Sequence, residues 1–178
     1  MGKRSDYERV ERDFYPTPWQ AVEPLVSHLP EEFAFAEPCG GDGALVDHIE
    51  TLIDGAWCSW VSDIEPQKKG IHTKHFRDLS EHEFLEADYI ITNPPWDRKL
   101  LHPMIEYFTA FRPTWLLFDA DWIHTKQSVE YLPLLKKIVS IGRVQWIPDS
   151  KSTGKDNCCW YLFDSANSQS IQFIGRKS

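Results

Sequence analysis

Asn93, Pro94, Pro95 and Trp96 are four consecutive residues whose types suit the holding of a planar amine. They follow an apolar run over 87–92 that is typical of a buried strand. Two prolines cannot continue a strand ladder, and each keeps the residue before it out of the helical region, so a stiff extended loop must begin here. Amide and backbone oxygens would accept hydrogen bonds from an amine while the indole stacks on its ring.

A glycine-rich turn over 37–43 is the second feature that could do chemistry, because it lies between a predicted strand, 33–37, and a predicted helix, 42–53. Its three glycines permit positive φ and close approach of a ligand to the backbone. The helix that follows would direct its free N–H groups toward that ligand. The glycine spacing differs from the dinucleotide-binding fingerprint. Glu37 and Asp42 would accept hydrogen bonds from an amine rather than tolerate a pyrophosphate.

Two further acids stand at predicted strand ends. Asp63 ends a predicted strand over 57–63, and Asp78 follows a weaker one over 71–76. In doubly wound folds an acid after the second strand typically binds both ribose hydroxyls of an adenosine group. Each acid taken singly is better explained as a loop or helix-cap residue. Together with Glu37, at successive strand ends, they indicate one ligand-binding crevice.

The alternation of short apolar strands and amphipathic stretches predicts an α/β fold built on a parallel sheet. The remaining predicted elements are helices over 100–111 and 128–137, a strand over 115–119, and antiparallel strands over 138–147 and 158–164.

Length and charge limit the possible classes. A chain of 178 residues suffices for one domain with a core and is short for two. The net charge of −8 disfavours a nucleic-acid partner, but residues 126–178 hold eight Lys or Arg and four acids, a net charge of +4. Lys151 and Lys155 lie in a predicted hairpin loop. They either contact a nucleic-acid backbone or belong to an ordinary solvated loop, and the sequence favours neither.

Several classes are disfavoured by motifs that the sequence lacks. No apolar run approaches membrane-spanning length, and no charged-then-apolar leader opens the chain. The histidines show no H-x-x-x-H or H-E-x-x-H spacing, which predicts no metal site. The cysteines show no C-x-x-C pair, and two are adjacent, which is poor geometry for disulfides and poor spacing for zinc. We therefore predict a reduced, cytoplasmic protein. The four cysteines are Cys39, Cys58, Cys158 and Cys159.

Four motifs stand in order along the chain: Y-P-T-P (15–18), E-P-C-G-G-D-G (37–43), S-D-I-E-P (62–66) and N-P-P-W (93–96). This order resembles amino-group DNA methyltransferases that use S-adenosylmethionine, and more closely their compact phage-encoded adenine forms. The resemblance covers roughly residues 14 to 164. It implies a Rossmann-like class I methyltransferase fold with a seven-stranded, mostly parallel sheet and an antiparallel C-terminal hairpin, which agrees with the seven strands predicted above.

The resemblance also implies an organisation for the whole chain. Residues 14–178 would form a single methyltransferase domain without a separate target-recognition domain, after a mobile segment over 1–13. A phage-encoded protein would act in the host cytoplasm. The chain departs from the family in having almost no helix between the second and third strands. Asp119 and Asp121 stand where family members are usually less acidic, and the sequence gives no account of them.

By resemblance, S-adenosylmethionine is the cofactor and DNA the partner. The implied cofactor-binding residues are Tyr15, Thr17 and Pro18 at the methionine end; Glu37, Pro38, Gly40, Asp42 and Gly43 around the amino-acid group; Asp63 at the ribose; Ile64 and Asp78 at the adenine; and Asn93.

Methyl transfer from a sulfonium needs an amine placed in line with the methyl group, and it needs neither a metal nor a nucleophilic side chain. We expect Asn93 and Pro94 to accept both protons of an adenine N6 amine, while Trp96 stacks on the base beside Pro95. Two alternatives remain open. The same corner suits an RNA adenine or a protein glutamine amide, and a non-catalytic S-adenosylmethionine-binding protein would keep the glycine turn.

Overall fold

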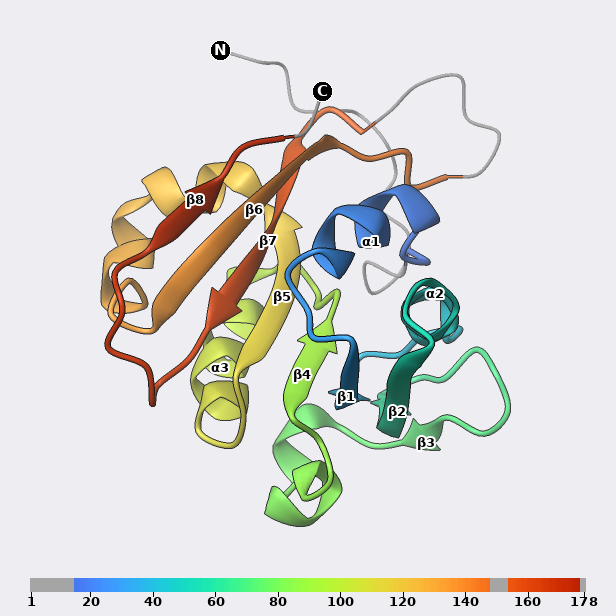
Figure 1. The fold of residues 1–178 in the computed structure, drawn as a ribbon. Helices are drawn as coiled ribbons and strands as arrows, with labels where there is room; N and C mark the ends of the chain where they lie inside the picture. Colours follow the sequence, from blue (N-terminus) through green and yellow to red (C-terminus); the bar gives the residue numbers. More distant parts are fainter. Residues whose placement is uncertain (1–14, 148–153, 177–178) are drawn as a thin grey trace.

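The structure is a computed structural model that describes residues 15–147 and 154–176. The segment 1–13, predicted to be mobile, and Lys151 lie outside the described residues. The fold is α/β, as predicted, with strands in the order β3-β2-β1-β4-β5-β7-β6-β8 (Figure 1). The strands are β1 (Glu32–Glu37), β2 (Gly55–Asp63), β3 (His72–Thr73), β4 (Tyr89–Thr92), β5 (Thr114–Asp119), β6 (Leu135–Arg143), β7 (Asn157–Phe163) and β8 (Gln172–Ile174).

Most strand pairs are parallel, and only β7 runs antiparallel to its neighbours, β5 and β6. The predicted antiparallel pairing near the C-terminus is therefore confirmed. The predicted count of seven strands is wrong, because β8 adds an eighth strand, parallel to β6, at the edge of the sheet. Only three residues form β8, and they are mostly exposed, so they carry no apolar alternation from which a strand could be predicted.

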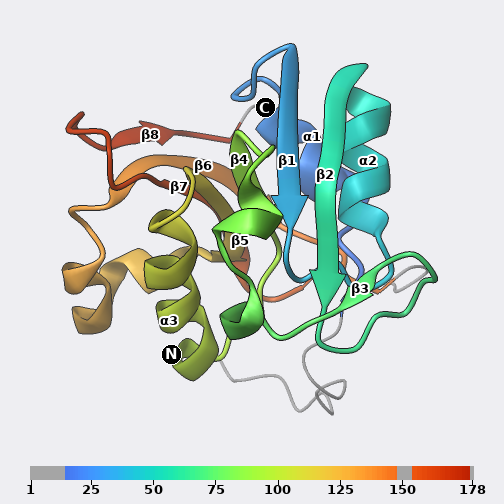
Figure 2. The same cartoon turned by 90° about the horizontal axis from the view of Figure 1, so that it is seen from below.

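The helices form a layer on each face of the sheet. Figure 2 shows α1 (Trp19–Val26) and α2 (Ala44–Leu52) on one face and α3 (Arg98–Thr109) on the other. Two apolar clusters correspond to these layers, one containing residues of α1 and α2 and the other containing residues of α3. Because helices cover both faces, the residues of β1 are buried without alternation after the first.

Residues 128–137 do not form the predicted helix. Short 3-10 segments, Ala120–His124 and Lys126–Glu130, precede a turn, and β6 then begins at Leu135. Pro133 has no N–H to donate to a helical carbonyl, and strand geometry buries Leu135 and Ile138 in the sheet. The helix α1, which contains Pro24, was not predicted. The weak third strand shrinks to two residues, which are both exposed.

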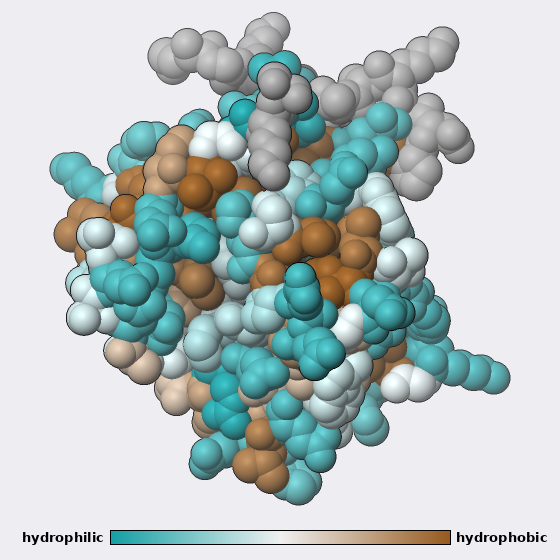
Figure 3. Space-filling view, viewed as in Figure 1, coloured by the Kyte–Doolittle hydropathy of each residue, from teal (hydrophilic) through white to brown (hydrophobic). Residues whose placement is uncertain are grey.

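Apolar surface on the face viewed in Figure 3 is divided into patches by hydrophilic side chains, and one patch lies over β8. Phe173 in that strand is 67% exposed. Among the described residues, no helix has both the length and the apolar character needed to cross a membrane.

The strand register determines where the predicted site residues at the strand ends lie. In the sheet Glu37 pairs with Val61, and Ala36 pairs with Ile90, so β1, β2 and β4 end side by side at one edge. The residues at or just beyond these ends are Glu37, Asp63 and Asn93. This is the edge at which open α/β sheets bind their ligands.

Candidate functional site

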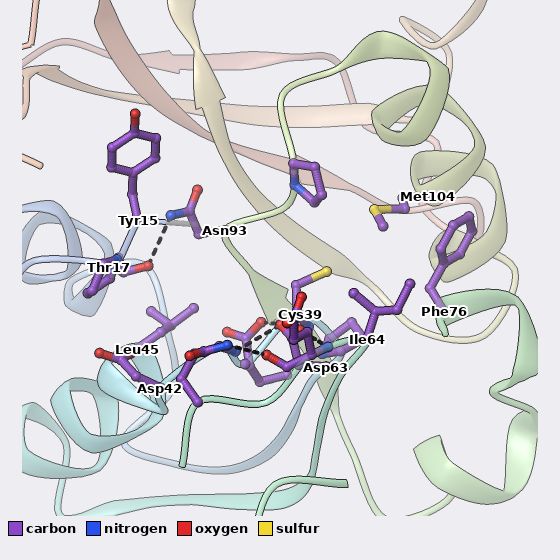
Figure 4. Close-up of a pocket in the computed structure, with 18 of the residues that line it drawn as sticks. Tyr15, Thr17, Cys39, Asp42, Leu45, Asp63, Ile64, Phe76, Asn93 and Met104 are labelled. Carbon is purple, nitrogen blue, oxygen red and sulfur yellow. Dashed lines mark hydrogen bonds between the residues drawn. The ribbon is translucent and has the colours of Figure 1, made fainter. Parts of the chain in front are cut away.

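A cavity of about 350 Å³ opens at the carboxyl ends of β1, β2 and β4, and its size falls in the range of small-molecule and cofactor sites. Figure 4 shows Tyr15, Thr17 and Asn93 at one end and Phe76 and Met104 at the other. The residues that line it are Tyr15, Pro16, Thr17, Glu37, Pro38, Cys39, Gly40, Gly41, Asp42, Leu45, Asp63, Ile64, Glu65, Gln67, Lys74, His75, Phe76, Asn93, Pro95, Leu100 and Met104.

The glycine turn is built so that the backbone itself forms one wall of this cavity. The N–H of Gly40 donates to the carbonyl of Ser62 in β2 at 2.8 Å. A Cβ at Gly40 would lie 2.6 Å from Cγ2 of Val61, so only glycine fits without displacement. Gly41 has a φ of 50°, in the left-handed region that glycine adopts without strain. The turn therefore presses closely against β2 and leaves the space above it open.

Asp63 ties the turn to the end of β2. Its carboxylate accepts the N–H of Gly41 at 2.9 Å through Oδ2 and the N–H of Glu65 at 2.7 Å through Oδ1. A carboxylate oxygen can accept more than one hydrogen bond, so Asp63 keeps acceptor capacity toward the cavity that it lines. Asp63 therefore stabilises the glycine turn in the fold itself, and a ligand hydroxyl would donate a further hydrogen bond to the same carboxylate.

Glu37 places a buried carboxyl at the cavity. Its side chain is 1% exposed, and Oε1 accepts the N–H of Cys39 at 3.1 Å. Oε2 is buried and lacks a hydrogen-bond partner. Burial raises the pKa of Glu37 from 4.5 to about 8; the nearby Thr92 hydroxyl and the N–H of Cys39 act against this rise, and the negative charge of Asp63 adds to it. An unpartnered buried carboxyl oxygen of this kind fits a ligand that brings a donor or a positive charge.

Asn93 lies at the end of the cavity that Tyr15 and Thr17 form, directly after β4. Its Nδ2 donates to Oγ1 of Thr17 at 3.1 Å, a contact between residues 76 apart in the chain (Figure 4). The amide carbonyl oxygen is a separate acceptor, and this bond does not use it. A ligand amine could therefore donate to Asn93 without displacing Thr17.

Apolar side chains that were not predicted as site residues close the far end of the cavity. Leu100 and Met104 stand four apart on α3, the helix that follows the N-P-P-W motif, and Phe76 faces them from the segment after β3. Together with Ile64 and Pro95 they provide walls suited to a flat ring. The spacing of Leu100 and Met104 was available in the sequence, and the proximity of α3 to the motif was the signal that could have found them.

Five of the predicted site residues do not line the cavity, and each has a position elsewhere. Pro18 and Gly43 are the residues that precede the first turns of α1 and α2. Asp78 is exposed in a 3-10 turn, and its N–H donates to the carbonyl of His75. Pro94 is buried beside the cavity-lining Asn93. The fifth residue is Trp96.

Trp96 is anchored next to the cavity rather than in it. Its Nε1 donates to the carbonyl of Leu117 at 3.2 Å, and its ring meets Trp146 edge-on, with centroids 5.7 Å apart. On another side it borders a hollow of about 20 Å³, together with Asp119 and Trp122. These contacts hold the half-buried indole beside the cavity.

The structure gives Asp119 a role that the sequence did not indicate. Its Oδ1 accepts the N–H of Asp121 at 3.0 Å and thereby caps the 3-10 segment Ala120–His124. Partial burial raises the pKa of Asp119. Asp121 contributes the capped N–H, and its side chain is exposed.

Other predicted features have simpler outcomes. Lys155 is exposed. All four cysteines are free. Within residues 15–147 and 154–176, no group of three or more His, Cys, Asp or Glu side chains is arranged to hold a metal ion.

No protein-family model matches the chain, and no curated protein matches it either. Solved structures do. A candidate RNA methyltransferase from Pyrococcus horikoshii is 17% identical, with a TM-score of 0.63, over 91% of this chain and 92% of that one. A modification subunit of a candidate type I restriction enzyme from Vibrio vulnificus is 11% identical, with a TM-score of 0.57, over 91% of this chain. The match covers 47% of that subunit, so the chain spans about half its length.

A third match is a candidate class I S-adenosylmethionine-dependent methyltransferase from Listeria monocytogenes, 9% identical with a TM-score of 0.56, over 90% of this chain and 63% of that one. At these identities the likeness concerns the fold alone. The chain has the Rossmann-like fold of class I methyltransferases, as the family resemblance implied.

Proposed function

We propose that this protein is an S-adenosylmethionine-dependent methyltransferase that transfers a methyl group to the N6 amine of adenine in DNA. The observation that carries the proposal is the position of Asn93. It stands at the wall of a cavity of about 350 Å³, with its Nδ2 bonded to Thr17 and its carbonyl oxygen outside that bond. The same cavity is lined by the glycine turn and the strand-end acids that suit the proposed cofactor.

The residues present fit S-adenosylmethionine. The unpartnered Oε2 of Glu37 suits an ammonium group, and the N-terminus of α2 with its glycine turn suits a carboxylate. Asp63 would take ribose hydroxyls, and Ile64, Phe76 and Met104 would enclose the adenine. When bound, this cofactor supplies an electrophilic methyl group on a sulfonium. The remaining assignments made by resemblance, such as Asp78 at the adenine amine, are part of the proposal.

The chain's own contribution to transfer is the positioning of an amine. The exocyclic nitrogen of adenine is a poor nucleophile because its lone pair is delocalised into the ring. The oxygen of Asn93 and the carbonyl of Pro94 would accept its two protons and stabilise the positive charge that develops on nitrogen. With the amine so held, its lone pair would be free to take the methyl group that the bound cofactor supplies, and the nitrogen would then release one proton to water. Removing one such acceptor should lower the rate about 10²–10³-fold.

The acceptor is tested by offering alternatives in parallel. Labelled S-adenosylmethionine is incubated with the full chain and unmethylated DNA, RNA or a protein mixture, and the label in each polymer is counted. We expect label in DNA. Label found only in RNA or only in protein would show that DNA is not the methyl acceptor, and the proposed transfer chemistry would still hold for that other polymer. Calorimetric binding of the cofactor without transfer to any polymer would identify a non-catalytic binding protein.

A further inference from the structure

We infer that Thr17 is a positioning residue that holds the amide of Asn93 so that its oxygen can accept from the methyl acceptor. The inference rests on the proposed function. Thr17 was expected only to contact the cofactor, and the inference gives it a second role, in the transfer step. Its basis is the bond of 3.1 Å between Nδ2 of Asn93 and Oγ1 of Thr17.

Thr17 is itself held firmly. Its side chain is 5% exposed, and the prolines on both sides restrict the backbone, with Pro18 disfavouring the helical region at Thr17. The helix α1 begins directly after this segment and buries Ala21, Val22 and Leu25 completely. The indole N–H of Trp160 in β7 donates to the carbonyl of Ala21 at 2.7 Å. The hydroxyl therefore has a fixed place relative to the sheet.

The chemistry of the amide explains why this place matters. The NH₂ end of Asn93 can only donate and the oxygen can only accept, so an acceptor amine requires the oxygen to face it. In that orientation the NH₂ end points into the protein and needs an acceptor of its own. Thr17 supplies that acceptor. Without it, a part-buried NH₂ group would lose its hydrogen bond in the productive orientation, and the amide would gain by rotating away.

Three matched variants test the inference. Thr17→Val keeps the shape and removes the hydroxyl, and we expect methyl transfer at saturating substrates to fall about 10-fold to 100-fold. Calorimetry should show a Kd for S-adenosylmethionine within about threefold of wild type. Thr17→Ser restores the hydroxyl and should recover most of the rate. Thr51→Val makes the same exchange on α2, where the hydroxyl donates to the carbonyl of Asp47, and should leave the rate unchanged.

A spectroscopic readout tests the contact independently of activity. The side-chain NH₂ pair of Asn93 is assigned in an NMR spectrum by its absence in Asn93→Asp. We expect the pair to shift and to exchange faster with solvent in Thr17→Val, and to remain near its wild-type position in Thr17→Ser. An unchanged pair in Thr17→Val, or equal losses of rate in the Val and Ser variants, would overturn the inference. A wild-type protein that transfers no methyl group would instead refute the proposed function.

Discussion

Replacing Glu37 by Gln is expected to change how stability depends on pH, because this carboxyl is buried beneath the proposed cofactor site. Gln keeps an acceptor for the N–H of Cys39 and has the shape of the protonated acid. Burial raises the pKa of Glu37 from 4.5 to about 8 in the folded chain. The folded state therefore binds this proton more tightly than the unfolded state. The contribution of the protonated Glu37 to stability is fully present below pH 4.5 and is lost as the pH rises to 8.

The size of the effect follows from the two pKa values. Each pH unit in this window corresponds to about 1.4 kcal/mol, so the wild-type chain loses roughly 5 kcal/mol from this group between the two values. The Gln variant has no proton to release at this position, so its stability does not fall for this reason as the pH rises. The difference in free energy of unfolding between variant and wild type should therefore rise by about 1.4 kcal/mol per unit between pH 5 and pH 8.

Urea denaturation at intervals of one pH unit measures this difference directly, and effects of other titrating groups largely cancel between the two proteins. Glu31→Gln, which makes the same exchange at an exposed carboxyl, is the matched control. A flat difference for Glu37→Gln, or one that falls as pH rises, would refute the assignment of a protonated buried carboxyl at this site.

Three other outcomes follow from the same geometry. Gly40→Ala should cost about 1–3 kcal/mol of stability and weaken S-adenosylmethionine binding, because its Cβ would lie 2.6 Å from a methyl of Val61. Gly175→Ala is the control, because its Cβ would meet nothing within 4 Å. Calorimetry that finds the two variants alike would contradict this. Trp96→Phe removes the bond to the carbonyl of Leu117 and should cost about 1 kcal/mol in urea denaturation, and no change would show that this bond contributes nothing. Methyl transfer should proceed at its full rate in EDTA, since the proposed chemistry uses no metal, and inhibition that added magnesium reverses would argue against it.

The strand-end features could be predicted from the sequence because their signals are local. An apolar run followed by Asn93 and two prolines defines both the end of β4 and the loop after it, and the glycine turn similarly marks the end of β1. Residues 15–18 could be connected to the site only through the family resemblance. The contact of Thr17 with Asn93 joins residues 76 apart and depends on how α1 packs, which no local pattern encodes.

The errors have physical causes of the same kind. The pattern over 128–137 is compatible with a helix, but its last three residues belong to β6, which pairs with β7 and β8. The stacking of Trp96 on a base stays a prediction, and the contacts of its indole with Trp146 and the carbonyl of Leu117 depend on tertiary packing that no local sequence pattern encodes. Asp119 caps a turn that itself was not predicted.

The central claim is that Asn93 serves a reaction that methylates adenine in DNA. The most direct test is nucleoside analysis by mass spectrometry of DNA from cells that lack adenine methylation and express either the wild-type chain or Asn93→Ala. The variant should still bind S-adenosylmethionine. We predict N6-methyladenine in the wild-type sample and a far lower level in the variant sample, because losing the Asn93 acceptor should slow transfer about 10²–10³-fold. Unmodified DNA from cells containing folded wild-type protein, or equal modification by both proteins, would contradict the account.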